Sequence, residues 1–239
     1  MKLKILVVKF FRLLGFNISK IKKPQDLTPF LFHHFNIDLL LDVGANSGQY
    51  SLLARRNGYS GSIISFEPLS SAHKKLIVNA KNDNYWKVYP RCGIGSSISE
   101  LTINISKNSY SSSLLDILPS HTDAAPESKY IGKETVNIKT LDSLFDENLF
   151  NLHHKSIYLK IDTQGFEKEV LEGSLTSLQY IKCVELELSV ILLYKNQNLY
   201  DFFFKFMREN GFELWTLSPG ISDPKSGQLL QFDAIFFKK

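Results

Sequence analysis

The chain has few of the features that would assign it to a large protein class at once. Its 239 residues include only two cysteines, Cys92 and Cys183, and no C-x-x-C pair, which excludes a disulfide framework and a cysteine zinc site. The net charge is only +4, so the composition gives no reason to expect a nucleic-acid partner. We expect both thiols to be buried and structural, in a reducing compartment.

Long hydrophobic runs are also absent. A membrane-spanning helix needs about 20 apolar residues, and the best candidate, Lys4–Phe16, is interrupted by Lys9 and Arg12. It lacks the small-residue cleavage site of a signal peptide. Its apolar residues fall at helical spacing beside basic ones, which predicts a basic amphipathic helical segment within residues 1–35. Such a segment either packs on the domain or makes weak peripheral contact with a membrane surface.

Strand-like and helix-like segments alternate over residues 36–239, which we take as one domain. The predicted strands are 39–43, 62–66, 85–89, 101–106, 135–138, 156–162, 180–188, 212–217 and 231–237. The predicted helices are 47–57, 69–80, 167–178 and 198–211. This alternation is typical of a mostly parallel sheet with helices on both faces. The last two strands predict an antiparallel pair at one edge, and the polar stretch Lys107–Lys133 predicts a long loop.

A glycine-rich turn, in the stretch LDVGANSGQY (41–50), follows the first strand. Glycine permits a positive φ and leaves no Cβ to block a ligand. Glu67 ends the second strand, where a carboxylate can accept hydrogen bonds from both hydroxyls of a ribose. The turn lacks the third glycine of a dinucleotide site and the lysine of a P-loop. An adenosine cofactor without a pyrophosphate remains, and S-adenosylmethionine is the main candidate.

Several motifs together resemble one family. DVGANSGQYS, FEP, TLDSL (140–144), LKIDTQGFEKEVLEG (159–173) and ELELSVILLYKNQ (185–197) are similar to segments of the FkbM methyltransferases. The resemblance runs from about residue 39 to 237. It implies the class I methyltransferase fold, a Rossmann-like three-layer sandwich whose mostly parallel seven-stranded sheet carries an antiparallel strand at its edge. Many members have Glu where Gln164 stands, so we expect no essential carboxylate at that position.

The resemblance implies methyl transfer from S-adenosylmethionine to a hydroxyl, commonly on a sugar, glycan or related natural product. The predicted cofactor-binding residues are Asp42, Gly44, Ala45, Asn46, Gly48, Tyr50, Glu67 and Pro68. Asp42 would organise the turn and reach the methionine end through a hydrogen-bond network. Asn46 is also a candidate N-cap, and Tyr50 lines either the cofactor pocket or the core.

Asp162 is the main catalytic candidate, because it ends a buried strand beside the first one and a carboxylate there can take the proton of an acceptor hydroxyl. It could instead cap the next turn or bind the cofactor's ammonium group. Lower-ranked substrate contacts are Glu187, Tyr194 and His121, although Tyr194 could be a packing residue and His121 merely exposed. Asp162 with one glutamate could hold a divalent metal, but we expect no metal requirement.

The expected partners are a small-molecule or glycan hydroxyl acceptor and no nucleic acid. The missing signal peptide and the cofactor favour a cytoplasmic location. Two alternatives stay open. One is a catalytically inactive cofactor-binding protein that regulates a glycan-assembly pathway, and the other is an NAD-linked oxidoreductase, which the incomplete dinucleotide pattern disfavours.

Overall fold

The computed structural model describes residues 12–15, 28–146 and 156–239. Its main sheet has the strand order β3-β2-β1-β7-β8-β10-β9. These strands are β1 (Leu39–Val43), β2 (Ser62–Phe66), β3 (Trp86–Val88), β7 (Ile157–Ile161), β8 (Ile181–Ser189), β9 (Phe212–Pro219) and β10 (Gln231–Lys238). β3, β2, β1, β7 and β8 pair in parallel, and β10 runs antiparallel to both β8 and β9. The predicted fold class is therefore confirmed, and the antiparallel strand lies one position in from the edge.

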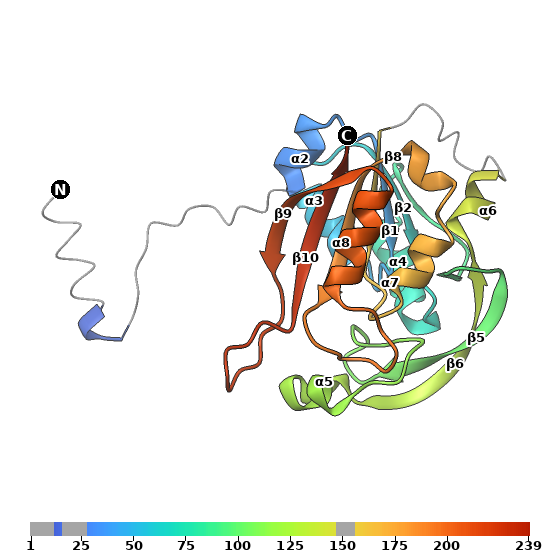
Figure 1. Cartoon of the computed structure of the whole chain (residues 1–239). Helices are drawn as coiled ribbons and strands as arrows, with labels where there is room; N and C mark the ends of the chain where they lie inside the picture. The colour runs from blue at the N-terminus through green and yellow to red at the C-terminus, as the bar shows by residue number, and fades with distance from the viewer. Residues whose placement is uncertain (1–11, 16–27, 147–155) are drawn as a thin grey trace, which may run out of the picture.

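Helices cover both faces of this sheet (Figure 1). One face packs on α2 (Thr28–His34), α3 (Gln49–Arg56) and α4 (Ser70–Ala80). The other packs on α6 (Leu141–Asp146), α7 (Glu167–Glu172), the 3-10 helix η3 (Ser177–Tyr180) and α8 (Tyr200–Glu209). Every residue of β1 and β7 is buried, as expected for central parallel strands that are covered on both sides.

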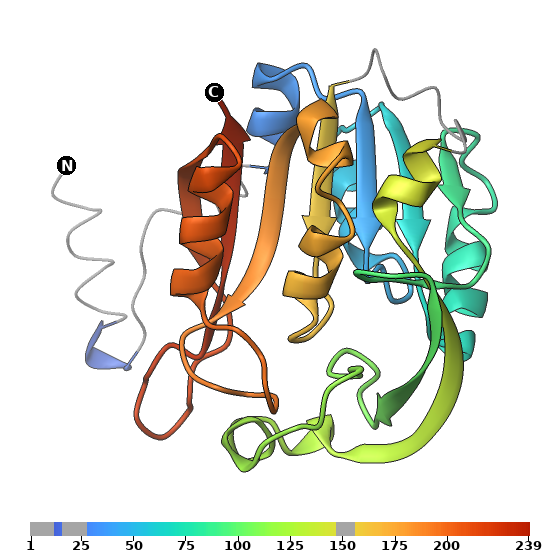
Figure 2. The ribbon, with the colours of Figure 1, turned by 45° about the vertical axis from the view of Figure 1, so that its right-hand side comes forward.

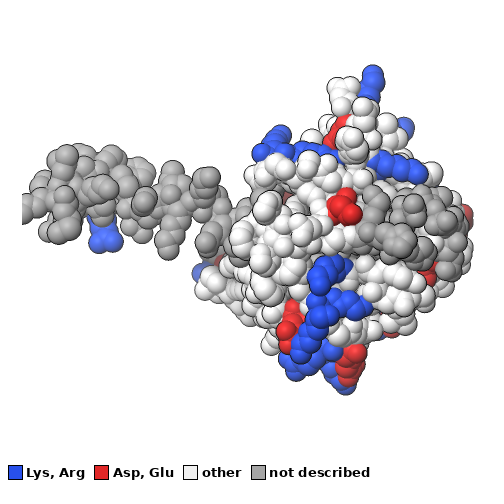
Figure 3. Space-filling view, turned by 90° about the horizontal axis from the view of Figure 1, so that it is seen from above, with Lys and Arg blue, Asp and Glu red and all other residues white. Residues whose placement is uncertain are grey.

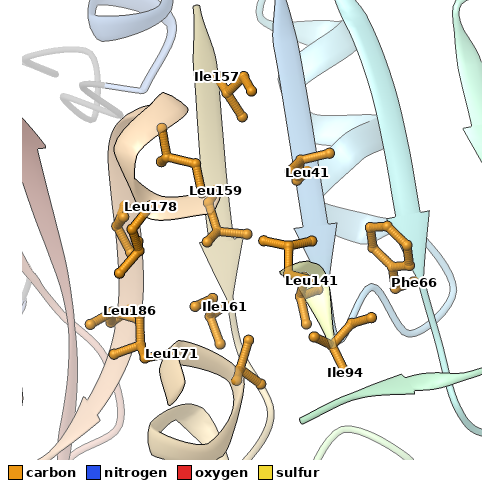
Figure 4. Packing of buried hydrophobic residues seen from close by; sticks show 14 of the residues in the cluster. Leu41, Phe66, Ile94, Leu141, Ile157, Leu159, Ile161, Leu171, Leu178 and Leu186 are labelled. Atoms are coloured by element: carbon orange, nitrogen blue, oxygen red, sulfur yellow. The ribbon is translucent and has the colours of Figure 1, made fainter. Parts of the chain in front are cut away.

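The larger core lies on the α6–α7–α8 face, where alternate side chains of the strands interleave with helix residues (Figure 4). Leu41, Leu159 and Leu186 come from neighbouring strands, and Leu171 and Leu178 close over them. Cys92 and Cys183 are both free and buried, as predicted. Most of the stabilisation of such a fold comes from this apolar burial, at about 25 cal/mol per Å².

A smaller sheet lies opposite the carboxyl ends of the main strands (Figure 2). It consists of β4 (Gly93–Ile94), β5 (Ser99–Ser106) and β6 (Tyr130–Lys139), in the order β4-β6-β5. The stretch 107–133 is not one long loop as predicted, because it contains α5 (Pro119–Ala124), the 3-10 helix η1 (Pro126–Ser128) and the start of β6. Ser111, Ser112 and Ser113 are buried and hydrogen-bonded, which holds the segment in place.

Two further predictions need correction. The helix predicted over residues 167–178 is two short pieces, α7 and η3, because the chain turns at Gly173 and Ser174. The packed domain also begins before residue 36, because Leu31 and Phe32 of α2 belong to the core and the Phe32 ring packs edge-on against Tyr158.

The amphipathic helix predicted over residues 4–16 lies outside the described residues, apart from 12–15. None of the helices in the described ranges is long and apolar enough to cross a membrane. Figure 3 shows the end of the molecule opposite the carboxyl ends of the strands, where basic side chains lie beside acidic ones and most of the surface is uncharged.

Candidate active site

The glycine-rich turn after β1 presses against the end of β7. Gly44 has φ +81°, and a Cβ added there would lie 1.9 Å from the backbone oxygen of Asp162. Gly48 has φ +88°, and a Cβ there would overlap the Trp86 ring at 2.7 Å. The turn needs glycine at both positions because of space as well as backbone conformation. Residues 44 and 162, which are far apart in sequence, therefore meet directly.

All five successive backbone amides of residues 44–48 donate hydrogen bonds within the protein. The first two donate to the carbonyl of Phe66, and the third donates to Glu67 Oε2 at 2.7 Å. The last two donate to Asn46 Oδ1 and to the carbonyl of Ala45. Asn46 is therefore not the N-cap of α3, which is Gly48. The turn amides already have partners, so they are a poor cradle for a phosphate group.

Glu67 lies buried at the end of β2 and faces a cavity of about 240 Å³, here called the Glu67 cavity. Its two oxygens accept from the amides of Asn46 and Leu69, at 2.7 and 2.8 Å. Burial raises the pKa of Glu67 to about 7, against the lowering effect of these two hydrogen bonds. An ionised carboxylate offers about four acceptor positions, so capacity for two further hydroxyl donors remains.

A second cavity, of about 400 Å³, lies between α3 and the strands β7, β8 and β10. We call it the Tyr50 cavity. Its polar lining includes Tyr50, Lys160, Glu185, Glu187 and Asp233. The residues that line both cavities are Gly44, Asn46, Tyr110, Asp162 and Glu187. The two cavities therefore meet at the glycine-rich turn, where two carboxylates face the junction.

Asp162 is held on both oxygens. Lys160 Nζ donates to Oδ2 at 2.9 Å, and Gln164 Nε2 donates to Oδ1 at 2.8 Å. Burial would raise the pKa of Asp162, but the Lys160 ammonium and these hydrogen bonds outweigh it and lower the pKa below 3.8. Asp162 is therefore an ionised carboxylate at the junction, and its affinity for a proton is low.

Gln164 joins the two carboxylates. Its Nε2 also donates to Glu187 Oε2 at 2.5 Å, while its Oε1 accepts from the hydroxyl of Tyr194 at 2.8 Å. Its backbone is left-handed, with φ +55°, and its carbonyl accepts from Ser113 Oγ at 2.6 Å. The sequence alone marks residue 164 only as a departure from the family pattern. Its position two residues after a strand-ending aspartate, before a glycine, was the available signal.

Tyr50 lines the Tyr50 cavity, and its hydroxyl is held by a buried carboxylate. Its hydroxyl and that of Tyr158 both donate to Glu185 Oε2, and the Lys160 ammonium lies 5.2 Å from the centre of the Tyr50 ring. Burial raises the pKa of Glu185 to about 7, ahead of repulsion from Asp233. Tyr50 therefore packs against the core and lines the Tyr50 cavity, not the Glu67 cavity, so its contact with a cofactor stays a prediction.

Other predicted site residues lie behind the cavities. Asp42 is fully buried, with Ser51 Oγ donating to Oδ2 at 2.7 Å and Oδ1 left without a partner in the described part of the chain. Tyr194 is fully buried and lines neither cavity. His121 is buried rather than exposed, and its ring packs edge-on against Tyr194.

The remaining predicted cofactor residues divide between the cavities. Pro68 lines the Glu67 cavity, Ala45 lines the Tyr50 cavity, and Gly48 lines neither. Glu167, which opens α7, turns back to accept from the amides of Thr163 and Gly165 and so stabilises the turn after β7. Within the described ranges, no group of three His, Cys, Asp or Glu side chains is placed to hold a metal ion.

Comparison with protein families identifies the group to which this architecture belongs. The model of the methyltransferase FkbM domain matches residues 42–214, which include the turn, Glu67, Asp162, Gln164 and Glu187. The chain belongs to the FkbM methyltransferase family. No curated protein matches this family member at a significant level.

Solved methyltransferases share the fold of this FkbM domain at low sequence identity. The methyltransferase domain of METTL16 aligns with a TM-score of 0.50 and 10% identity, over 93% of this chain and 70% of that one. An rRNA methylase from Streptococcus thermophilus aligns at 0.48 and 9% identity, over 92% and 99%. A precorrin-6y C5,15-methyltransferase from Geobacter metallireducens aligns at 0.41 and 11% identity, over 94% of both chains. These likenesses concern the fold alone.

Membership of this methyltransferase family implies S-adenosylmethionine as the cofactor of the FkbM domain. The residues present fit that molecule. The buried carboxylate of Glu67 has acceptor capacity for the ribose hydroxyls, and the apolar side chains beside it offer a wall for the adenine ring. Those apolar residues are Leu69, Cys92, Ile94, Ile103 and Phe166.

Proposed function

We propose that the chain transfers the methyl group of S-adenosylmethionine to a hydroxyl of a small-molecule or glycan acceptor. The observation that supports this most is the meeting of two cavities at Asp162 and Glu187. One cavity has the chemistry for an adenosine group, and the other has a polar lining suited to a hydroxylated acceptor. Asp162 and Glu187 would then lie beside the hydroxyl of the bound acceptor.

The protein's contribution follows from these contacts. The bound cofactor would supply a methyl group carried on a sulfonium sulfur. After transfer, the rest of the cofactor would be a neutral thioether. Glu67 would hold the ribose hydroxyls, and the glycine-rich turn would set the depth of the cofactor against the end of β7. A carboxylate at the junction would orient the acceptor hydroxyl and receive its proton. Alignment of the two reactants can by itself contribute about 7–11 kcal/mol of barrier reduction.

The oxidoreductase alternative is disfavoured by the turn. A dinucleotide needs free amides for its pyrophosphate, whereas the amides of residues 44–48 already donate within the protein. The inactive-regulator alternative differs only in turnover, so a panel of hydroxylated acceptors with radiolabelled S-adenosylmethionine separates it from the enzyme.

Calorimetric titration with S-adenosylhomocysteine tests the cofactor assignment. Micromolar binding to the wild type that collapses in Glu67→Ala would support it. Glu172→Ala is the matched control, because Glu172 pairs with Lys168 on the surface and lines neither cavity. If the wild type binds NAD and no S-adenosylhomocysteine, the proposal is wrong.

A further inference from the structure

The two carboxylates at the junction are not equally engaged by the protein. Both oxygens of Asp162 accept strong hydrogen bonds, one from the Lys160 ammonium. Glu187 accepts its two hydrogen bonds, from Gln164 and Gln231, on the single oxygen Oε2. Glu187 Oε1 accepts none from an N–H or O–H donor in the described part of the chain. This oxygen is therefore available to a hydroxyl that enters the junction.

The charges around Glu187 give it the higher proton affinity of the pair. Asp162 at the end of β7, Asp233 of β10 and Glu167 of α7 repel its negative charge, and Lys160 attracts it. Burial, followed by repulsion from these three carboxylates, raises the pKa of Glu187 well above 4.5. The neighbouring Glu187 also contributes to lowering the pKa of Asp162. Such a pair titrates in two separated steps, as in other carboxylate dyads.

Gln164 keeps this arrangement in one orientation. The Tyr194 hydroxyl donates to its Oε1, so its NH2 group must point at the carboxylates, and each N–H reaches one of them. A glutamate in place of Gln164 would add a further negative charge and remove both donors. The amide is therefore suited to holding two carboxylates close together.

We propose that Glu187, rather than Asp162, takes the proton of the acceptor hydroxyl, and that Gln164 is the positioning residue that presents it. This inference rests on the proposed function. As the acceptor oxygen forms its bond to the methyl carbon, the S–C bond pair passes to sulfur. The O–H bond pair stays on the acceptor oxygen, and the proton moves to Glu187 Oε1. Asp162 remains ionised beside Lys160 throughout and raises the proton affinity of its neighbour.

A carboxyl titration of the free protein tests the proton assignment without any acceptor or cofactor. The side-chain carboxyl carbons of Glu and Asp are labelled with ¹³C and followed by NMR across pH. Glu67, Glu167 and Glu185 also titrate above 4.5. Among the Glu resonances that do so, we expect one that is lost in Glu187→Gln and moves to lower pH in Asp162→Asn. In Gln164→Glu it moves to higher pH. A Glu187 that titrates near 4.5 beside an Asp162 that titrates above it would overturn the proposal, even if the protein methylates nothing in the panel.

The dependence of kcat on pH can then be measured with any hydroxylated acceptor that the panel identifies. We expect the kcat of Glu187→Gln to be about 10²–10⁴-fold lower than that of the wild type, and the rising limb of its pH profile to disappear. Its affinity for S-adenosylhomocysteine should be unchanged. Asp162→Asn should keep that limb, displaced to lower pH. Loss of the limb in Asp162→Asn and its retention in Glu187→Gln would contradict the proposal. Glu187→Asp, which keeps a carboxyl group, should recover the limb. Unchanged S-adenosylhomocysteine affinity of Glu187→Gln shows that its loss of activity is not misfolding.

Discussion

The carboxylate of Glu67 accepts a 2.7 Å hydrogen bond from the backbone amide of Asn46, which ties the end of β2 to the turn after β1. The acid expected to bind a ribose is thus also a structural part of the turn. Substitutions at this position change ligand binding and turn geometry together, and two different variants are needed to separate the effects.

Replacing Glu67 by alanine should destabilise the protein by about 1–3 kcal/mol, because the buried amides of Asn46 and Leu69 lose their acceptor. Glu67→Gln should cost less, since one acceptor oxygen remains. Urea denaturation of both variants measures the difference. Equal losses would mean that the hydrogen bonds to the turn contribute little.

The Gly44 position is predicted to tolerate no side chain. Gly44→Ala should destabilise by about 1–3 kcal/mol more than Gly58→Ala, because only the first Cβ meets the Asp162 carbonyl. Both glycines have positive φ, +81° and +94°, and a Cβ at Gly58 has nothing within 4 Å, so backbone strain is matched. Chemical denaturation compares the two variants, and similar losses would contradict the close contact.

Lys160 is predicted to matter far more than a surface lysine. Lys160→Met leaves the partly exposed Asp162 carboxylate without its cation, which should cost about 1–3 kcal/mol and raise the pKa of Asp162. Lys168→Met breaks the exposed pair with Glu172 and should cost no more than about 0.5 kcal/mol. Denaturation curves of the two methionine variants provide the comparison. Comparable losses of stability in the two variants would show that the Lys160–Asp162 pair adds nothing to the free energy of unfolding.

Stability should depend on pH through Glu185, whose pKa is about 7 in the folded protein and 4.5 in the reference state. Between these values the folded chain holds a proton that the unfolded chain has released, so stability falls as pH rises through this window. Glu67 and Glu167 act in the same direction, with pKa values of about 7. Glu185→Gln should therefore make the decline shallower without abolishing it.

Denaturant midpoints across pH measure this slope, with Glu172→Gln as the exposed control. A slope in Glu185→Gln as steep as that of the wild type would show that Glu185 is ionised in the folded state.

The sequence was sufficient to locate most strands of the main sheet along the chain, because their apolar runs are short, bounded and separated by segments with helical spacing. It was sufficient to place the glycine-rich turn after the first strand and Glu67 at the end of the second, because these residues form a local pattern. The part they play in binding a cofactor stays a prediction. The small sheet was missed as a unit because β4 and β6 pair across more than 40 residues, and nothing local in two residues of β4 marks a strand.

The network around Gln164 could not be read from sequence for a different reason. Its partners come from the end of β7, from β8, from the segment after β8 and from the segment between β5 and α5. Only the folded chain brings Glu187 and Tyr194 to the same amide. Burial also reversed the expectation for His121, since polar neighbours in sequence indicated exposure whereas the ring packs on Tyr194.

The pairing of β1 with β7 joins two parts of the chain that are more than 100 residues apart, with Leu39 opposite Ile157. Glu67 lies on one side of this seam and Asp162 on the other, so a ligand that contacts both would clamp the two halves together. Amide hydrogen exchange should then slow in β1 and β7 at the same time when S-adenosylhomocysteine binds. Occupancy of the site would thus act on a long-range pairing of the fold and couple the chain's resistance to unfolding to its supply of cofactor.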